Sequence, residues 1–126
     1  MREIKLSDLP KTWIIDLDGV IFIHNDYLER GEQERLVYGI KEFLSMNIKK
    51  SDVVILLTAR AKKYRAITEK SLKRNKIRYD YFMMDLPKGE RILMNDRKPS
   101  GMLMAYALNS KRDKVPKVRY ITIKRQ

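Results

Sequence analysis

The stretch TWIIDLDGV, residues 12–20, decides the fold of this 126-residue chain. Its residues 13–15 form a short continuous apolar run, the pattern expected of a strand whose two faces are both covered. The run ends in two aspartates one residue apart, Asp16 and Asp18, and Gly19 then permits an abrupt change of backbone direction. A buried strand with two carboxylates at its tip predicts a site for a cation, a phosphoryl group or both.

Strand and helix patterns alternate through the rest of the chain. Further strands are predicted at residues 53–58, 78–84, 91–95 and 118–123, helices at 32–47, 60–75 and 102–109, and a small hairpin or flap at 20–31. Alternating strands and helices imply right-handed crossovers and a mostly parallel sheet layered with helices. We therefore predict one α/β domain over residues 1–126, a three-layer Rossmann-like fold with a mostly parallel five-stranded sheet.

Composition limits the classes of function. The formal net charge of +12 attracts anions, which fits a phosphorylated or nucleic-acid substrate, but a merely lysine-rich surface would carry the same charge. The absence of cysteine excludes disulfide scaffolds, thiolate zinc sites and thiol nucleophiles. The longest aliphatic run, Val53–Leu57, is far too short to cross a membrane, so we expect a cytoplasmic protein without a membrane segment.

Polar residues follow three of the predicted strands: Asp16 with Asp18, then Thr58, then Asp96. Because the working site of a parallel sheet lies at the carboxyl ends of its strands, we expect these side chains to meet. An ionised carboxylate such as that of Asp16 can attack phosphorus and form an aspartyl-phosphate. Asp18 can protonate the leaving oxygen and later take a proton from the attacking water.

Two carboxylates that face a phosphate also need a cation. An oxygen-only donor set predicts Mg²⁺, with Asp96 as a third anchor. Thr58 can donate its hydroxyl to a phosphoryl oxygen, and backbone N–H groups beyond it can add more hydrogen bonds. Either Lys88 or Lys98 would neutralise the remaining charge. The predicted substrate contacts are Gly19, Thr58, Ala59 and Arg60.

Three stretches of this sequence resemble the haloacid dehalogenase superfamily: DLDGV (16–20) its first motif, LLTAR (56–60) its second, and ILMNDRKPSG (92–101) its fourth. The resemblance implies that Asp16 is the nucleophile, Asp18 the general acid and base, and Thr58 the phosphoryl-binding residue. It also implies that Mg²⁺ is held by the Asp16 side chain, the Asp18 backbone carbonyl and Asp96. The family's fourth motif often has two acidic residues, whereas here Asn95 precedes Asp96 and no aspartate follows within several positions. We therefore expect only one carboxylate from this strand, with Asn95 orienting a metal-bound water.

The resemblance also bears on size and substrate. The segments 19–31 and 83–88 are too short for a cap domain, so we expect an open site, shielded by the flap or by a neighbouring subunit of a homo-oligomer. Residues 92–101 are similar to small phosphatases of bacterial capsule and surface-polysaccharide synthesis. The main hypothesis is therefore a magnesium-dependent phosphomonoesterase acting on a sugar phosphate or nucleotide-linked metabolite.

Two other functions stay open. The charge of +12 and the missing cap favour a polynucleotide end phosphatase, and an acidic pocket that only binds Mg²⁺ and a phosphorylated partner would be a non-catalytic module. The lysines and arginines between residues 62 and 78 are read most simply as the solvated face of a helix. His24, in the flap, and Arg60, at the start of that helix, are interpreted in the same way as exposed residues.

Overall fold

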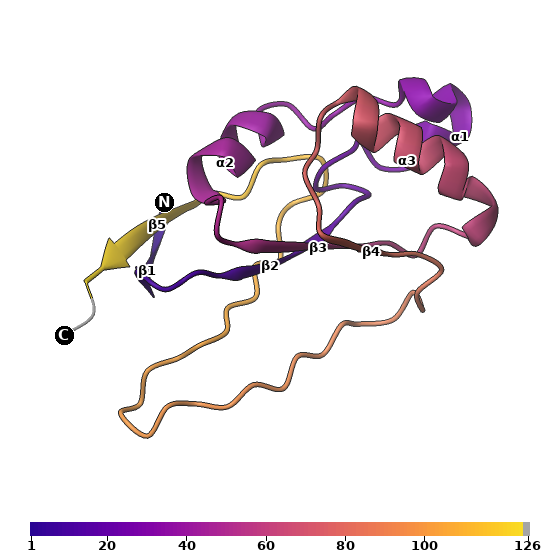
Figure 1. Cartoon of the computed structure of the whole chain (residues 1–126). Coiled ribbons are helices and arrows are strands. Elements are labelled where there is room, and N and C mark those ends of the chain that lie inside the picture. Colours follow the sequence, from indigo (N-terminus) through magenta and orange to yellow (C-terminus); the bar gives the residue numbers. More distant parts are fainter. Residues whose placement is uncertain (125–126) are drawn as a thin grey trace.

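The computed structural model describes residues 1–124 and contains two parallel sheets, with the longer helices on one side of the larger sheet (Figure 1). In the smaller sheet β1 (Arg2–Ser7) pairs with β5 (Val118–Ile123), and in the larger the strand order is β2 (Thr12–Asp16), β3 (Val53–Leu57), β4 (Tyr81–Met83). The helices are α1 (Asp26–Arg30), α2 (Ile40–Asn47) and α3 (Arg65–Arg74), with 3₁₀ turns at Gly31–Gln33 (η1) and Lys62–Tyr64 (η2). The α/β class is confirmed, but the single five-stranded sheet is wrong.

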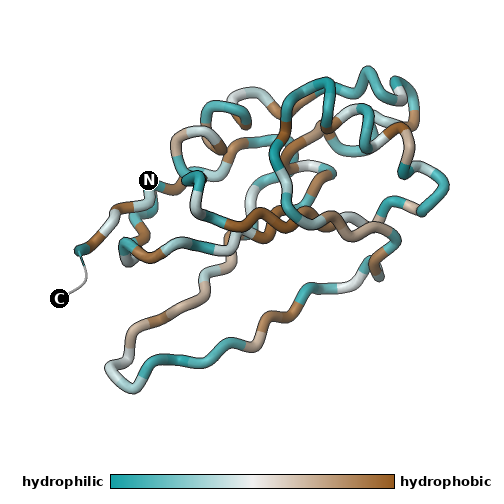
Figure 2. Tube along the Cα trace, viewed as in Figure 1, coloured by the Kyte–Doolittle hydropathy of each residue, from teal (hydrophilic) through white to brown (hydrophobic). Residues whose placement is uncertain are grey.

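The three-stranded sheet buries one face beneath the helices. Alternate residues of its strands, among them Val54 and Leu56, point toward α2 and α3, where they join Leu72 and Ile40 in the core. Figure 2 shows the strands as the most hydrophobic continuous part of the chain. In the register Asp16 lies opposite Leu57, so β2 and β3 end at the same level and their polar successors lie at one edge.

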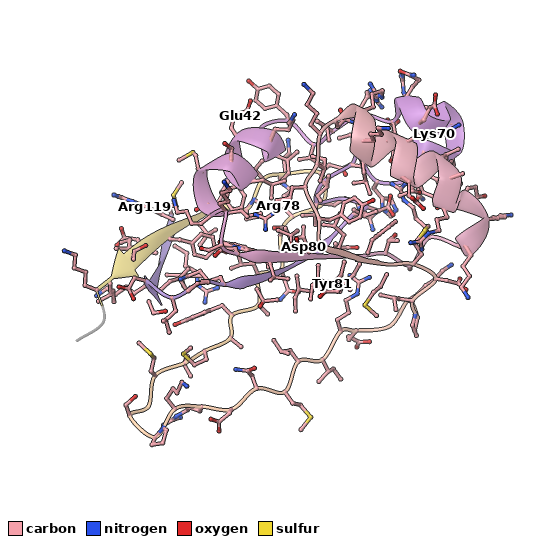
Figure 3. The ribbon with its side chains drawn as sticks, in the orientation of Figure 1. Glu42, Lys70, Arg78, Asp80, Tyr81 and Arg119 are labelled. Carbon is pink, nitrogen blue, oxygen red and sulfur yellow. The ribbon has the colours of Figure 1, made fainter. Side chains whose placement is uncertain are left out.

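The other face of this sheet carries no helix. Ile14, Tyr81 and Met83 are 52%, 63% and 49% exposed there, and Figure 3 shows Tyr81 on the side of the sheet away from α3. A parallel sheet normally has both faces covered. The predicted three-layer arrangement is therefore only partly present, because the third layer lacks helices.

The segment 86–112 runs past the uncovered face without forming a strand or a helix within the described residues (Figure 1). The predicted strand 91–95 and helix 102–109 are thus wrong: Ile92 and Met94 are 85% and 91% exposed, and Gly101 has a left-handed φ of 90°. A strand without a ladder partner leaves its backbone groups unpaired. An eight-residue helix without a surface to pack on is marginal in water. None of the helices in residues 1–124 is long and apolar enough to span a membrane.

Three other predicted elements differ from the observed ones, and local backbone features or contacts account for two of the differences. The predicted helix 32–47 begins only at Ile40, because Gly39 adopts a φ of 83° and Leu36 forms a β-bridge with Phe22. The predicted flap 20–31 is not a flap, since Ile21 and Phe22 are fully buried and α1 follows them. The predicted helix 60–75 is replaced by η2 and the shorter α3.

Candidate active site

The candidate site lies where β2 and β3 end. The Leu17 N–H donates to the Leu57 carbonyl at 3.2 Å, which keeps the two chains together one residue beyond the strands. Gly19 then turns the chain with a φ of 85°, and its N–H donates to the Phe22 carbonyl at 2.7 Å. A side chain at this position would be strained by that φ. This turn directs the Asp18 side chain inward.

Asp18 belongs to a buried ion network with Arg60 and Glu34. Arg60 Nε and Nη2 donate to the two carboxylate oxygens of Asp18 at 3.1 and 3.0 Å, and Nη1 and Nη2 donate to Glu34 at 2.9 and 2.6 Å. The side chains of Arg60 and Glu34 are fully buried, whereas that of Asp18 keeps 17% exposure. Paired N–H groups on two edges of one guanidinium hold both carboxylates in fixed orientations.

All five guanidinium N–H groups of Arg60 are used, because Nη1 also donates to Thr68 Oγ1 at 3.1 Å. The guanidinium lies over the Tyr27 ring, 4.0 Å from its centroid. Burial by itself would lower the pKa of Arg60, but its hydrogen bonds with Glu34 and Asp18 outweigh burial and raise that pKa. Arg60 is therefore a buried cation, and its interpretation as a solvated helix residue is wrong.

Thr58 connects this network to the strand edge. Thr58 is fully buried, and its hydroxyl donates to Asp18 Oδ2 at 3.4 Å. The oxygen of this hydroxyl also accepts a hydrogen bond from the backbone N–H of Arg60 at 3.1 Å. With Thr58 and Arg60 as donors, Asp18 accepts three hydrogen bonds out of the roughly four that a carboxylate can take. The backbone N–H groups of Asp18 and Ala59 have no hydrogen-bond partner within residues 1–124.

Asp16 lies outside the buried network. Its carboxylate is 38% exposed and pairs with Arg91 Nη1 at 3.2 Å, an arginine on the irregular segment that is itself 40% exposed. Solvent therefore reaches Asp16 from the edge of the sheet. Within the described residues, Arg91 is the residue that forms an ion pair with Asp16, through one carboxylate oxygen.

The structure brings only part of the predicted site together. Asp16, Asp18 and Thr58 share one strand edge, whereas Lys88, Asn95, Asp96 and Lys98 are all exposed on the segment 86–112. No ion pair or hydrogen bond within residues 1–124 joins these four to Asp16 or Asp18. No group of three or more His, Asp or Glu side chains in that range is placed to hold a metal ion. The predicted convergence of Asp96 with the other strand ends is therefore not observed.

Two residues of the site were missed from the sequence. Glu34 stands in an irregular stretch after η1, and nothing in its local pattern distinguishes it from an exposed glutamate. Arg91 was read only as the first residue of a strand. The sequence around Glu34 or Arg91 contains no signal for its place in the site. Each makes its contact with a residue far away along the chain, Glu34 with Arg60 and Arg91 with Asp16.

Solved structures of an RNA repair assembly are similar to part of this chain. No protein-family model and no curated protein matches the chain. Among solved structures, a chain of the Pnkp1/Rnl/Hen1 complex is 30% identical, with a TM-score of 0.53 over 68% of this chain. A chain of the Pnkp1/Rnl/Hen1 RNA repair complex is also 30% identical, with a TM-score of 0.53 over 69% of this chain. This chain spans only 31% and 29% of their lengths, so it is similar to one part of proteins found in an RNA repair assembly.

Proposed function

We propose that this chain is a phosphatase that removes a terminal phosphate from a polynucleotide. The observation that carries the proposal is the likeness to chains of an RNA repair complex, at 30% identity and a TM-score of 0.53. The net charge of +12 suits a polyanionic substrate. The comparisons favour this function over the hydrolysis of a sugar phosphate in capsule synthesis, for which they offer no support.

Asp16 is the proposed nucleophile because its carboxylate is at the strand edge and accessible. Its oxygen attacks phosphorus, an Asp16 oxygen–phosphorus bond forms, and the bond from phosphorus to the sugar oxygen breaks. Asp18 must be protonated when the substrate binds, which requires one of its oxygens to give up its bond to Arg60. It then passes that proton to the sugar oxygen and regains one from the water that hydrolyses the aspartyl-phosphate. Free phosphate leaves, and Asp16 and Asp18 return to their starting states.

The phosphoryl group would be bound by Thr58 and by backbone donors. The N–H groups of Asp18 and Ala59, just beyond the ends of β2 and β3, have no hydrogen-bond partner in the described residues and can donate to phosphoryl oxygens without breaking existing bonds. Arg60 was expected to contact substrate, but with all its N–H groups used it is better suited to hold Asp18 in position. The cation that faces the phosphate would come from the segment that carries Lys88, Arg91 and Lys98.

The donors at the strand edge fit Mg²⁺. Asp16 offers carboxylate oxygens and Asp18 a backbone carbonyl, and Mg²⁺ in phosphoryl-transfer sites is often held by only one or two carboxylates with substrate oxygens and water. Bound there, the ion would neutralise charge on the phosphate. Asp96 stays a proposed third ligand, which requires the segment 86–112 to approach the edge of the sheet.

The test compares four substrates in the presence of Mg²⁺. Two are the same RNA oligonucleotide phosphorylated at its 5′ end or at its 3′ end, and the others are a hexose phosphate and p-nitrophenyl phosphate. We expect phosphate release from one of the RNA ends to have the highest kcat/KM. Asp16→Asn should abolish release, whereas Asp8→Asn, an exposed aspartate in the β1–β2 turn, should leave it unchanged. Faster hydrolysis of the hexose phosphate would contradict the polynucleotide assignment, and an active Asp16→Asn variant would contradict the nucleophile.

A further inference from the structure

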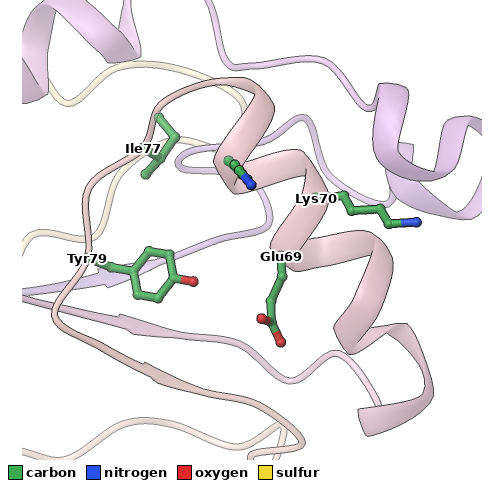
Figure 4. Close-up of a pocket in the computed structure, with 5 residues that line it drawn as sticks. Glu69, Lys70, Ile77 and Tyr79 are labelled. Carbon is green, nitrogen blue, oxygen red and sulfur yellow. The ribbon is translucent and has the colours of Figure 1, made fainter.

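A groove lies between α3 and the loop that leads to β4, away from the carboxylates of the candidate site. It has a volume of ≈ 370 Å³ and is lined by Glu69, Lys70, Lys73, Ile77 and Tyr79. Figure 4 shows the Tyr79 ring pointing from the loop toward α3, with Ile77 above it and Glu69 projecting from the helix. Ile77 belongs to the buried core and is only 8% exposed, whereas the Tyr79 ring is half-buried. The exposed part of that aromatic ring is the kind of surface on which a nucleobase stacks.

A second groove of ≈ 380 Å³ adjoins the first across the same two lysines. Its lining is Glu32, Lys70, Lys73 and Arg74, so Lys70 and Lys73 form a ridge between the two grooves. The Lys70 side chain points away from Tyr79 (Figure 4), and it also lines the second groove. The two lysines thus lie where the backbone of a strand would pass if one of its bases rested on Tyr79.

The charge of this region is positive and largely available. Glu69 is paired with Arg65 at 2.9 Å, and Lys70 approaches Glu32 only at 3.8 Å in an exposed contact. Lys73 has no ion pair within residues 1–124. Three cations therefore stand on the ridge and its flank, Lys70, Lys73 and Arg74, where phosphates would lose their counterions on binding.

Arg74 gives the ridge a fixed anchor. Its Nε and Nη2 donate to the backbone carbonyls of Glu32 and Glu34 at 3.0 and 3.1 Å, so its charge is held in place without being neutralised by a carboxylate. The second contact is to the backbone of Glu34, whose side chain binds Arg60. The ridge and the candidate active site are thus joined through residues 32–34.

We propose that these grooves bind a nucleotide of a polynucleotide substrate at a distance from its reacting end, with the base on the exposed part of Tyr79 and phosphates on Lys70, Lys73 and Arg74. This inference rests on the proposed function. α3 begins beside the active site and rises about 12 Å between Arg65 and Lys73. At ~3.4 Å per stacked nucleotide, that distance corresponds to about four nucleotides.

Binding of a fluorescein-labelled single-stranded RNA of ten nucleotides tests the groove directly. Tyr79→Ala should weaken binding by about 5- to 150-fold, the range for losing one stacked base, whereas Tyr79→Phe should bind as the wild type does. The double variant Lys70→Gln, Lys73→Gln should reduce the slope of log K against log salt by about 1.4, at roughly 0.7 for each phosphate contact on a single strand. The matched control is Lys5→Gln, Lys41→Gln, two exposed lysines on other elements, and should keep the wild-type slope.

Activity separates this inference from the proposed function. Turnover of p-nitrophenyl phosphate should be unchanged in every groove variant, while KM for RNA should fall beyond about four nucleotides in the wild type and not in Tyr79→Ala. If the wild type hydrolyses an RNA end phosphate but the lysine and Tyr79 variants bind RNA equally well, the groove is refuted and the phosphatase stands. If the wild type neither binds RNA nor hydrolyses its end phosphate, both proposals fail.

Discussion

The buried network predicts a large and specific cost for a small change, Glu34→Gln. The wild-type carboxylate accepts two hydrogen bonds from Arg60, at 2.6 and 2.9 Å, and is fully buried. The amide of glutamine can accept one of these bonds, but its NH₂ group would face an Arg60 N–H, donor against donor. A charge-assisted hydrogen bond is worth about 1.5–3 kcal/mol, and a buried unsatisfied donor costs about 1–3 kcal/mol.

Together these contributions give an expected loss of about 3 kcal/mol in the free energy of unfolding. The value lies at the lower end of the ~3–5 kcal/mol seen when a buried ion pair loses one partner, because Arg60 keeps its two bonds to Asp18. The matched control is Glu3→Gln, which removes an exposed carboxylate 3.8 Å from Arg119 and should cost well under ~1 kcal/mol.

Urea unfolding measures both variants. With a slope of about 1–3 kcal/mol per molar urea, the Glu34→Gln midpoint should fall by at least ~1 M while the Glu3→Gln midpoint barely moves. Equal midpoints for the two variants would refute the buried network as a source of stability. A lower slope in Glu34→Gln would instead indicate a change in the unfolded or native ensemble, so the two slopes must agree before the midpoints are compared.

Three further predictions concern acid stability, metal and the irregular segment. Burial raises the pKa of Asp52, but hydrogen bonds from the Lys11 and Lys49 backbone N–H groups and the Trp13 indole outweigh burial and lower that pKa below its ordinary 3.8. The Asp52 carboxylate therefore stabilises the fold above pH ~4, and this stabilisation is lost as the pH falls through the folded-state pKa. Asp52→Asn should flatten the acid unfolding curve below pH ~4. Asp96→Asn should raise the Mg²⁺ concentration for half-maximal turnover by about tenfold if Asp96 is a ligand, and an unchanged value in an Mg²⁺ titration would remove it from the site. Arg91→Ala should leave the melting temperature unchanged, because the ion pair of Arg91 with Asp16 is exposed. It should lower the Mg²⁺ concentration for half-maximal turnover by up to about fivefold. A higher Mg²⁺ concentration would show that Arg91 does not compete with the metal.

Local patterns predicted the strands that carry the site. The apolar run before Asp16 and the run 53–57 form adjacent parallel strands, so the pairing of Asp18 with Thr58 could be expected from chain order and strand polarity alone. Both strands are short and apolar on two faces, which is a pattern that few other elements share. The lysines and arginines of the helix predicted at 60–75 were assigned to its solvated face, and the buried residues of α3 are others: Thr68, Ser71 and Leu72.

Long-range packing decided what the patterns could not. Arg60 looks like any arginine at the start of a basic helix, and its burial depends on two carboxylates and the Tyr27 ring arriving from other parts of the chain. The strand predicted at 91–95 has the right residues, but strand propensity becomes structure only where a partner supplies the ladder. β1 was missed for the opposite reason: its sequence is charged, yet Ile4 is 3% exposed because β5 pairs beside it.

The proposed catalytic groups are divided between the edge of the three-stranded sheet and the irregular segment 86–112. Asp16, Asp18 and Thr58 are held by the sheet, whereas Lys88, Asp96 and Lys98 lie on a segment linked to Asp16 by one exposed ion pair, a contact worth about 0–1 kcal/mol. Fixing a residue costs about 1–2 kcal/mol, so this pair cannot hold the segment against the site.

Substrate binding must therefore supply the free energy that brings these groups together, and a substrate can do so only through contacts beyond the reacting phosphate. p-Nitrophenyl phosphate has almost none, whereas an oligonucleotide offers further phosphates and bases to the basic segment. Contacts with the grooves on α3 act equally before and during the reaction and should lower KM. Contacts that order the segment act on the chemical step, so a longer polynucleotide should raise kcat as well.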